Sequence, residues 1–240
     1  MRRRQRLGFW YGFVVLVVKP LMRILTHRDW RGMEHIPAEG GIIVAANHVS
    51  ELDPFCVGHF LYNQGRPPRF LAKAELFRKA PVKWVLNGAK QIPVLRNSAD
   101  ASQSLQAAVE ALHRGECVLI YPEGSATRDP QLWPMRARTG VARLALLSGV
   151  PVIPVAQWGP EQILPYKARR PKLLPRRTMR VLAGPPVDLS QFEGKPMTVE
   201  LLRSATDVIM HRVAEQLAEL RGGHPPKEFF DMRDTRKEPA

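Results

Sequence analysis

The chain is poor in cysteine, aromatic residues and acidic residues, and each shortage narrows the class of protein. The only two cysteines, Cys56 and Cys117, lie in apolar runs without metal-ligand spacing. We therefore expect buried free thiols of a reducing compartment rather than a disulfide framework or a metal site. Aromatic residues make up 8% of the chain and are not interleaved with the basic clusters. This composition argues against a base-stacking surface for nucleic acid.

The shortage of acidic residues gives the chain a strongly positive charge. Lysine and arginine number 36 against 22 aspartates and glutamates, a net charge of +14. Such a balance favours an anionic partner: nucleic acid, a membrane surface or a phosphorylated small molecule. Because no nucleic-acid recognition motif is present, we expect no nucleic-acid partner.

The chain also lacks an apolar run of the ~20 residues that a helix needs to cross a bilayer. The longest candidate, Leu7–Val18, lies in a segment 1–25 that has arginines at both ends. Lys19 and Pro20 follow instead of a signal-peptide cleavage site. Basic ends and aromatic residues near the start favour a helix that dips into one leaflet of the membrane. The alternative is a helix packed on the protein's own core.

From Gly40 onwards, short apolar runs alternate with helical patterns, which predicts a single α/β domain over 26–222. A charged tail, 223–240, is predicted to be flexible. The predicted strands are 41–46, 69–72, 91–95, 117–121, 151–156 and 179–183. The predicted helices are 54–62, 99–114, 140–148 and 198–220.

The stretch Asn47–Phe55 follows the first of these strands and carries His48 and Asp53. On one continuous helix these two side chains would lie ~140° apart, so they can meet only if the chain breaks between them. A strand end at His48, a short turn, and Asp53 capping the next helix would provide that break. The pair would then form the base and orienting carboxylate of a triad. The sequence contains no G-x-S-x-G motif for a nucleophile, so the simplest reaction is deprotonation of a substrate hydroxyl.

Further polar residues follow the other predicted strands. Lys73 ends 69–72, Arg96 ends 91–95, and the stretch Tyr121–Arg128 follows 117–121. The carboxyl ends of strands are where α/β sheets place their ligands. A single arginine in a loop is as often a solvated surface charge, since such residues are mostly exposed. Together, however, these residues predict an anion-binding edge next to His48.

Four stretches in this order resemble the glycerophospholipid acyltransferase family, in particular the bacterial 1-acylglycerol-3-phosphate (lysophosphatidate) acyltransferases. They are NHVSELDPF, the segment AKAELF to GAKQIPVLR, YPEGSATRD and VPVIPV. The resemblance covers roughly residues 30 to 185. It implies a mixed β-sheet flanked by helices, as in glycerol-3-phosphate acyltransferases.

The resemblance implies transfer of an acyl group from acyl-CoA or acyl carrier protein to lysophosphatidate, with phosphatidate as the product of this step in phospholipid biosynthesis. His48 would be the general base and Asp53 would hold its tautomer. Lys73, Arg96 and Arg128 would bind the acceptor phosphate, and Glu123 would fix glycerol hydroxyls or those basic side chains. Gly124, with Ser125 beside it, is the candidate for oxyanion binding through its amide. No metal or tightly bound cofactor is implied.

One departure from the family pattern concerns Arg128. The family has the arginine directly after the hydroxyl residue, whereas here Ala126 and Thr127 separate it from Ser125. Arg128 is therefore a displaced equivalent. The tract Lys167–Arg180, with seven basic residues and no acid, could meet anionic lipid or an acidic carrier protein, or could be a solvated face.

Alternative functions share much of this pattern. The same chemistry could act on glycerol 3-phosphate or on another lyso-lipid or glycolipid. A non-catalytic lipid-binding membrane protein would keep the apolar N-terminus and basic surface but has no use for paired His and Asp. For the acyltransferase, the expected location is the cytoplasmic face of the cell membrane, with the protein attached to the phospholipid surface from one side.

Overall fold

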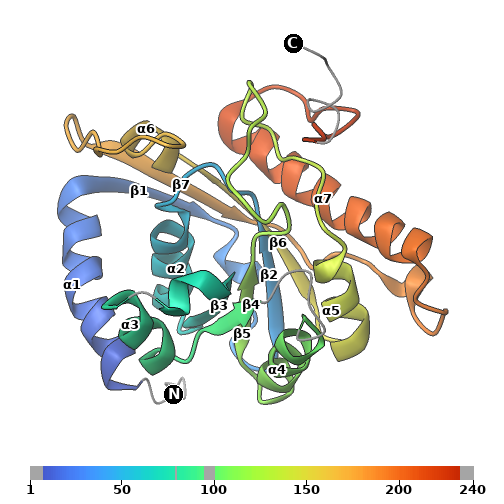
Figure 1. The fold of residues 1–240 in the computed structure, drawn as a ribbon. Helices are drawn as coiled ribbons and strands as arrows, with labels where there is room; N and C mark the ends of the chain where they lie inside the picture. Colours follow the sequence, from blue (N-terminus) through green and yellow to red (C-terminus); the bar gives the residue numbers. More distant parts are fainter. Residues whose placement is uncertain (1–7, 79, 95–100, 233–240) are drawn as a thin grey trace, which may run out of the picture.

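The computed structural model describes residues 8–78, 80–94 and 101–232. These form one α/β domain in which a twisted seven-stranded sheet lies between two layers of helices (Figure 1). The strand order is β1-β7-β6-β2-β5-β3-β4. The strands are β1 (Thr26–Arg31), β2 (Ile42–Ala46), β3 (Pro68–Lys73), β4 (Ile92–Val94), β5 (Cys117–Ile120), β6 (Val152–Trp158) and β7 (Arg177–Ala183).

The α-helices begin and end close to the periodic apolar segments of the sequence. They are α1 (Phe9–Leu25), α2 (Asp53–Asn63), α3 (Val82–Gly88), α4 (Ala101–His113), α5 (Gly140–Ser148), α6 (Pro160–Ile163) and α7 (Val199–Arg221). Helix α7 begins at the Thr198 cap, whose side chain accepts from Leu201 N at 3.1 Å. Helix α5 ends at Gly149, which has a left-handed φ of 64°.

Side chains on alternate positions of β2 pack into two separate cores. Ile43 and Ala45 belong to the core beneath α4, α5 and α7, whereas Ile42 and Val44 belong to the core that contains α2. This follows from the period of two in a strand, which sends successive side chains to opposite faces. Because both faces are covered, β2 is apolar throughout, as expected for a central parallel strand.

The direction of the strands decides which loops share an edge. Strands β6, β2, β5, β3 and β4 are all parallel, β7 is antiparallel to β6, and β1 is parallel to β7. The segments after β2, β3, β4, β5 and β6 therefore emerge at one edge of the sheet. The start of β7 lies at the same edge, next to the end of β6, since Trp158 pairs with Arg180.

The structure confirms the predicted α/β domain with a mixed sheet, and each of the six predicted strands is present within a few residues. Residue 95 of the third predicted strand, 91–95, lies outside the described residues. Strand β1 was missed because Thr-His-Arg-Asp-Trp-Arg has no apolar run. It is an edge strand paired only with β7, and Thr26 is its one buried residue. Helices α3 and α6 were also missed, both being short.

The first part of the tail that is predicted to be flexible contacts the rest of the domain. Phe230 O accepts from Arg136 N at 2.9 Å, and Asp231 Oδ2 pairs with Arg136 Nη1 at 2.9 Å. The described part of this segment is therefore bound to the loop before α5. The remainder, 233–240, lies outside the described residues.

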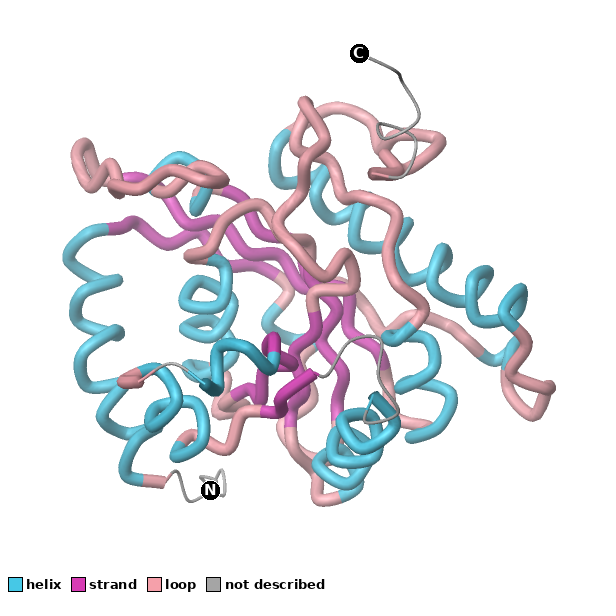
Figure 2. Tube along the Cα trace, viewed as in Figure 1, coloured by secondary structure: helices cyan, strands magenta, loops and turns pink. Residues whose placement is uncertain are grey.

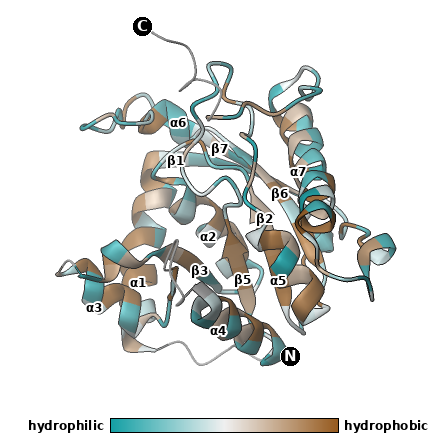
Figure 3. Cartoon of the chain, turned by 45° about the vertical axis from the view of Figure 1, so that its right-hand side comes forward, coloured by the Kyte–Doolittle hydropathy of each residue, from teal (hydrophilic) through white to brown (hydrophobic). Residues whose placement is uncertain are grey.

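Helix α1 occupies the predicted N-terminal segment and leaves much of its apolar surface uncovered. It contacts α3 and β1, and Tyr11 stacks on Tyr62 of α2 at 6.5 Å between ring centroids. None of its residues is buried, and it is coloured largely as hydrophobic in Figure 3. Among the described helices, none combines the length and apolar character required to cross a membrane.

Helix α2 carries a buried histidine that predicts how stability changes with pH. His59 is 7% exposed and packs edge-on against Trp30, with 4.9 Å between ring centroids. Burial, and then the positive charges of Arg28, Lys19 and Arg23, lower the pKa of His59 to about 4. The native state thus keeps this imidazole neutral where an unfolded chain protonates it, at ~6.5.

We therefore expect the free energy of unfolding to fall as pH is lowered from about 6.5 to about 4, since the unfolded state then binds more protons. His59→Gln should reduce this slope, whereas His113→Gln, at an exposed position, should not. Denaturant unfolding at a series of pH values measures both. Equal slopes in wild type and His59→Gln would contradict the assignment.

Candidate active site

His48 and Asp53 meet at the sheet edge where β2 ends. His48 Nδ1 lies 2.7 Å from Asp53 Oδ2, the side chain of Asp53 is fully buried, and that of His48 is 17% exposed. Since Nδ1 faces the carboxylate, the neutral ring carries its proton there and its free lone pair on Nε2. The structure therefore brings His48 and Asp53 together as predicted from the sequence, and this contact would fix the tautomer of the imidazole if His48 is the base.

The break between β2 and α2 is made differently from the prediction. Asp53 is the first residue of α2 rather than its cap; the N-cap is Leu52, which makes no side-chain cap. The Asp53 carboxylate turns back instead, and Oδ2 also accepts from Val49 N at 2.6 Å and Ser50 N at 2.9 Å. The same oxygen thus closes the turn and orients the imidazole.

The residue before His48 is fixed by a reciprocal amide pair. Asn47 Nδ2 donates to Gln157 O at 3.1 Å, and Asn47 Oδ1 accepts from Gln157 N at 2.8 Å. The Gln157 amide in turn donates to Asn47 O at 3.0 Å. These bonds continue the β2–β6 pairing past the end of β2. Gln157 was missed because nothing in its local sequence indicates a partner 110 residues away.

The loop after β5 holds the backbone of His48 on both sides. Glu123 Oε1 accepts from His48 N at 2.8 Å, and Thr127 N donates to His48 O at 2.7 Å. Tyr121, at the start of this loop, stacks on the imidazole with 4.5 Å between centroids. The sequence does not indicate a role for Thr127, because its contact with His48 is made by the main chain and not by its side chain.

Two residues of this loop with predicted roles in binding, Glu123 and Gly124, make main-chain hydrogen bonds in the structure. The second oxygen of Glu123 accepts from Met135 N at 2.8 Å, so both oxygens bind backbone N–H groups rather than basic side chains. Gly124 N donates to Tyr121 O at 2.9 Å within a turn, which removes it as the obvious oxyanion donor. Ser125 is partly exposed beside it.

The predicted phosphate-binding residues lie at the same sheet edge where the structure describes them. Lys73 is exposed at the end of β3 and pairs in register with Val94 of β4. Arg128 is exposed, directly after Thr127, and its Nη2 lies 3.5 Å from Tyr166 Oη. Arg96 lies outside the described residues, two positions beyond Val94. The edge therefore carries at least two exposed cations around the His48 loop.

Burial changes the acidity of both carboxyl groups that contact His48. It raises the pKa of Asp53, against the hydrogen bonds from His48, Ser50 and Val49 that favour the charged form. It raises the pKa of Glu123 to about 8, against the N–H groups of Met135 and His48. Each carboxyl is thus held in a dry setting where its hydrogen bonds are strong.

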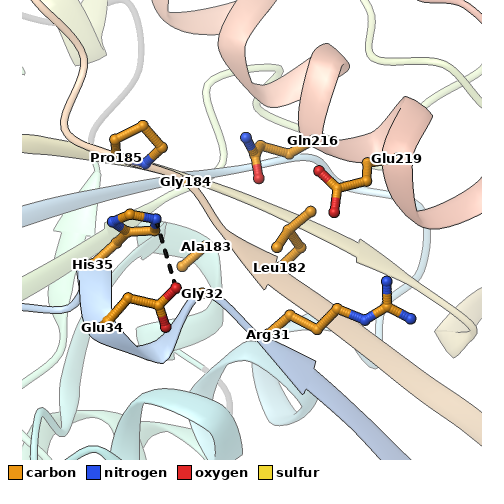
Figure 4. Close-up of a pocket in the computed structure, with 10 residues that line it drawn as sticks. All are labelled: Arg31, Gly32, Glu34, His35, Leu182, Ala183, Gly184, Pro185, Gln216 and Glu219. Carbon is orange, nitrogen blue, oxygen red and sulfur yellow. Dashed lines mark ion pairs between the residues drawn. The ribbon is translucent and has the colours of Figure 1, made fainter.

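A separate pocket of about 320 Å³ lies towards the amino ends of the central strands. Figure 4 shows Gln216 and Glu219 of α7 on one side of it and Arg31 and the Glu34–His35 ion pair on the other. None of the predicted site residues lines this pocket. In the part of the chain that the structure describes, no group of three His, Cys, Asp or Glu residues could hold a metal ion.

Comparisons with known proteins agree on one family. A family model described as "Acyltransferase" matches residues 27–158. The curated 1-acyl-sn-glycerol-3-phosphate acyltransferase of Bacillus subtilis (strain 168) is 27% identical over 211 residues, which cover 85% of this chain and 96% of that protein. The lyso-ornithine lipid O-acyltransferase of Pseudomonas aeruginosa is 36% identical over 111 residues, which cover 46% of this chain and 40% of that protein.

A solved structure has the same fold. The crystal structure of the 1-acyl-sn-glycerophosphate (LPA) acyltransferase, PlsC, from Thermotoga maritima superposes with a TM-score of 0.65 and 22% identity. The match covers 90% of each chain. It therefore includes the sheet and both helical layers.

We expect Asp53→Asn to lower kcat for acyl transfer, the reaction named by the matched family, by about 10² to 10⁴-fold. If the amide nitrogen of the substituted side chain faces His48, it donates to Nδ1 and forces the ring proton onto Nε2, which is the wrong tautomer. If the amide oxygen faces His48, the tautomer is kept but the negative charge that stabilises the imidazolium is lost. Steady-state kinetics of the purified variant measure this, and thermal unfolding checks that it is folded. A kcat within twofold of wild type would refute the orienting role of Asp53.

Proposed function

Because the chain belongs to the acyltransferase family, whose model matches residues 27–158, we propose that it transfers a fatty acyl group from an acyl thioester to the free hydroxyl of 1-acylglycerol 3-phosphate. The product would be phosphatidate. The observation that carries the proposal is the 2.7 Å contact of His48 Nδ1 with buried Asp53, at an edge that also holds Lys73 and Arg128. The Bacillus subtilis relative, similar over nearly its whole length, supports this choice of acceptor.

His48 is the general base in this proposal. Its Nε2 takes the proton of the acceptor hydroxyl as the oxygen attacks the thioester carbonyl. The tetrahedral intermediate then collapses, the C–S bond breaks, and the thiolate receives the proton from the imidazolium. Asp53 stabilises the imidazolium while it exists. Because a thiolate leaves readily, much of the rate enhancement comes from holding the two substrates together.

Lys73 and Arg128 are proposed to bind the acceptor phosphate, with Arg96 as a third cation. A guanidinium binds a phosphate through two parallel hydrogen bonds, and an ammonium acts as a compact charge. Support comes from the exposure of Lys73 and Arg128 at the sheet edge where His48 lies. The acyl donor would be acyl-CoA or acyl carrier protein, with no metal or bound cofactor needed.

A second candidate acceptor is a lyso-lipid without this phosphate. It is favoured by the similarity to the lyso-ornithine lipid O-acyltransferase, which has the higher identity of the two curated relatives over a shorter match. The two candidates share the His48–Asp53 chemistry and differ only in what Lys73 and Arg128 would contact.

We expect wild-type protein to acylate lysophosphatidate from an acyl thioester, and His48→Ala to lose this activity while remaining folded and bound to vesicles. Loss of the general base alone costs about 10² to 10⁴-fold. Thiol release and mass spectrometry of the products measure transfer with lysophosphatidate, glycerol 3-phosphate, monoacylglycerol and a lyso-amino-lipid as acceptors.

Monoacylglycerol lacks only the phosphate and is the matched control for the acceptor. Equal turnover of it and lysophosphatidate would reject the phosphate site. Transfer retained by His48→Ala would reject the mechanism. No thioester consumption with any acceptor would favour a non-catalytic lipid-binding protein.

We further propose that α1 attaches the protein to the cytoplasmic face of the cell membrane from one side. Its exposed apolar residues recur at helical spacing and form one stripe: Phe9, Phe13, Leu16, Val17, Leu21 and Ile24. A stripe of this kind on a helix with basic residues suits the boundary between headgroups and acyl chains. The basic tract Lys167–Arg180 follows β6 and α6 and so starts near the sheet edge that carries His48. It would meet anionic headgroups or an acidic carrier protein.

Leu16→Glu is expected to weaken binding to vesicles of phosphatidylglycerol and phosphatidylethanolamine, because it places a charge in the proposed buried face. Val199→Glu is the matched control, since Leu16 and Val199 are each 73% exposed but Val199 lies on α7. Co-sedimentation with vesicles measures binding. Equal loss in both variants, or in neither, would contradict the role of α1.

A further inference from the structure

Glu123 lies in the loop after β5, next to His48, but its side chain is buried. The residue is 4% exposed. Its two oxygens each accept one backbone hydrogen bond of 2.8 Å, from His48 N and from Met135 N. The carboxyl group is thus a bridge between two main-chain segments that are 87 residues apart in the sequence (135 − 48).

His48 needs such a bridge because it lies beyond the end of β2. Strand β2 ends at Ala46, so no strand pairing holds the backbone of His48. Its N–H is bound by Glu123, and its carbonyl is bound by Thr127 N at 2.7 Å. Both main-chain polar groups of the histidine are therefore held by one five-residue stretch of the loop.

The other end of the bridge is rigidly held. The segment around Met135 is bound by two arginines of α7: Arg203 Nη1 donates to Ala137 O at 2.6 Å, and Arg221 Nη1 donates to Gln131 O at 2.6 Å. The Arg221 guanidinium also lies 4.5 Å from the Trp133 ring centroid. Glu123 therefore links the main chain of His48 to a segment that is hydrogen-bonded to α7.

We propose that Glu123 is a positioning residue, which fixes the main chain of His48 so that its imidazole reaches Asp53, and that it does not bind the acceptor. The inference rests on the proposed function and deepens it. It assigns two different roles within one loop: Glu123 affects the rate through His48, and Arg128 binds the acceptor phosphate.

Substitution of Glu123 should change kcat rather than KM. Glu123→Gln keeps the shape but turns an NH₂ group towards one of the two N–H donors. Glu123→Asp keeps the carboxyl group but is one methylene too short to span both donors. Since a displacement of about 1 Å can cost 10²-fold in rate, each variant should lower kcat by up to about 100-fold. KM for the acceptor should stay within about twofold of wild type.

Two controls make the comparison specific. Glu116→Gln removes a carboxylate whose side chain is 13% exposed and which pairs with Arg69 at the opposite end of β5. It makes the same change of carboxyl to amide at a partly buried position away from His48, so kcat should be unaffected. Arg128→Ala is the comparator for acceptor binding and should raise KM for lysophosphatidate.

A second readout follows His48 directly. The proton on Nδ1, hydrogen-bonded to Asp53, should give a low-field NMR signal, assigned by its absence in His48→Ala. We expect this signal to shift or broaden in Glu123→Gln and Glu123→Asp but not in Glu116→Gln. An unchanged signal together with a raised acceptor KM, as in Arg128→Ala, would overturn the inference, and so would equal effects of Glu116→Gln and Glu123→Gln.

The two proposals fail in distinguishable ways. If wild-type protein transfers no acyl group to lysophosphatidate, the proposed function is wrong, yet the NMR comparison still decides whether Glu123 positions His48. If wild-type protein is active but the variants lose only acceptor affinity, the function stands and the positioning role is wrong.

Discussion

One oxygen atom, Oδ2 of Asp53, accepts three hydrogen bonds, and the arrangement of the site depends on it. Two of them, from the N–H groups of Val49 and Ser50, close the turn that separates β2 from α2. The third comes from the imidazole of His48. Because the carboxylate is fully buried, water does not compete for these bonds. Turn geometry and imidazole orientation are therefore set by the same charge.

Around this atom the strands of the sheet determine where the site residues lie, and the loops provide the hydrogen bonds that hold them. The parallel direction of β2, β5 and β3 brings their carboxyl ends to one edge. The segment that leaves this edge after β5, residues 121–139, is a long loop without a helix or strand of its own (Figure 2). Loops of this kind need tertiary support to hold chemistry in place. The backbone bonds from Glu123 and Thr127 to His48, and the amide pair of Asn47 and Gln157, provide it.

Charged groups at the site differ in exposure according to the role proposed for them. Lys73 and Arg128, the two cations proposed to bind the acceptor phosphate, are exposed at the sheet edge. The carboxyl groups of Asp53 and Glu123, which contact His48, are buried. Helix α1 adds an exposed apolar stripe at the side of the domain, where a lipid substrate could arrive from a membrane without crossing bulk water.

From its residues alone the chain determined the α/β architecture, the six strands with apolar runs and the pairing of His48 with Asp53. These depend on periodicity and on a break between a strand and a helix, which are local properties. Tertiary structure alone decided that β1 joins the sheet, that Asp53 turns back instead of capping α2, and that Glu123 binds the main chain of His48. Each of these depends on contacts between segments distant in sequence or on burial, and neither is encoded in a short stretch of residues.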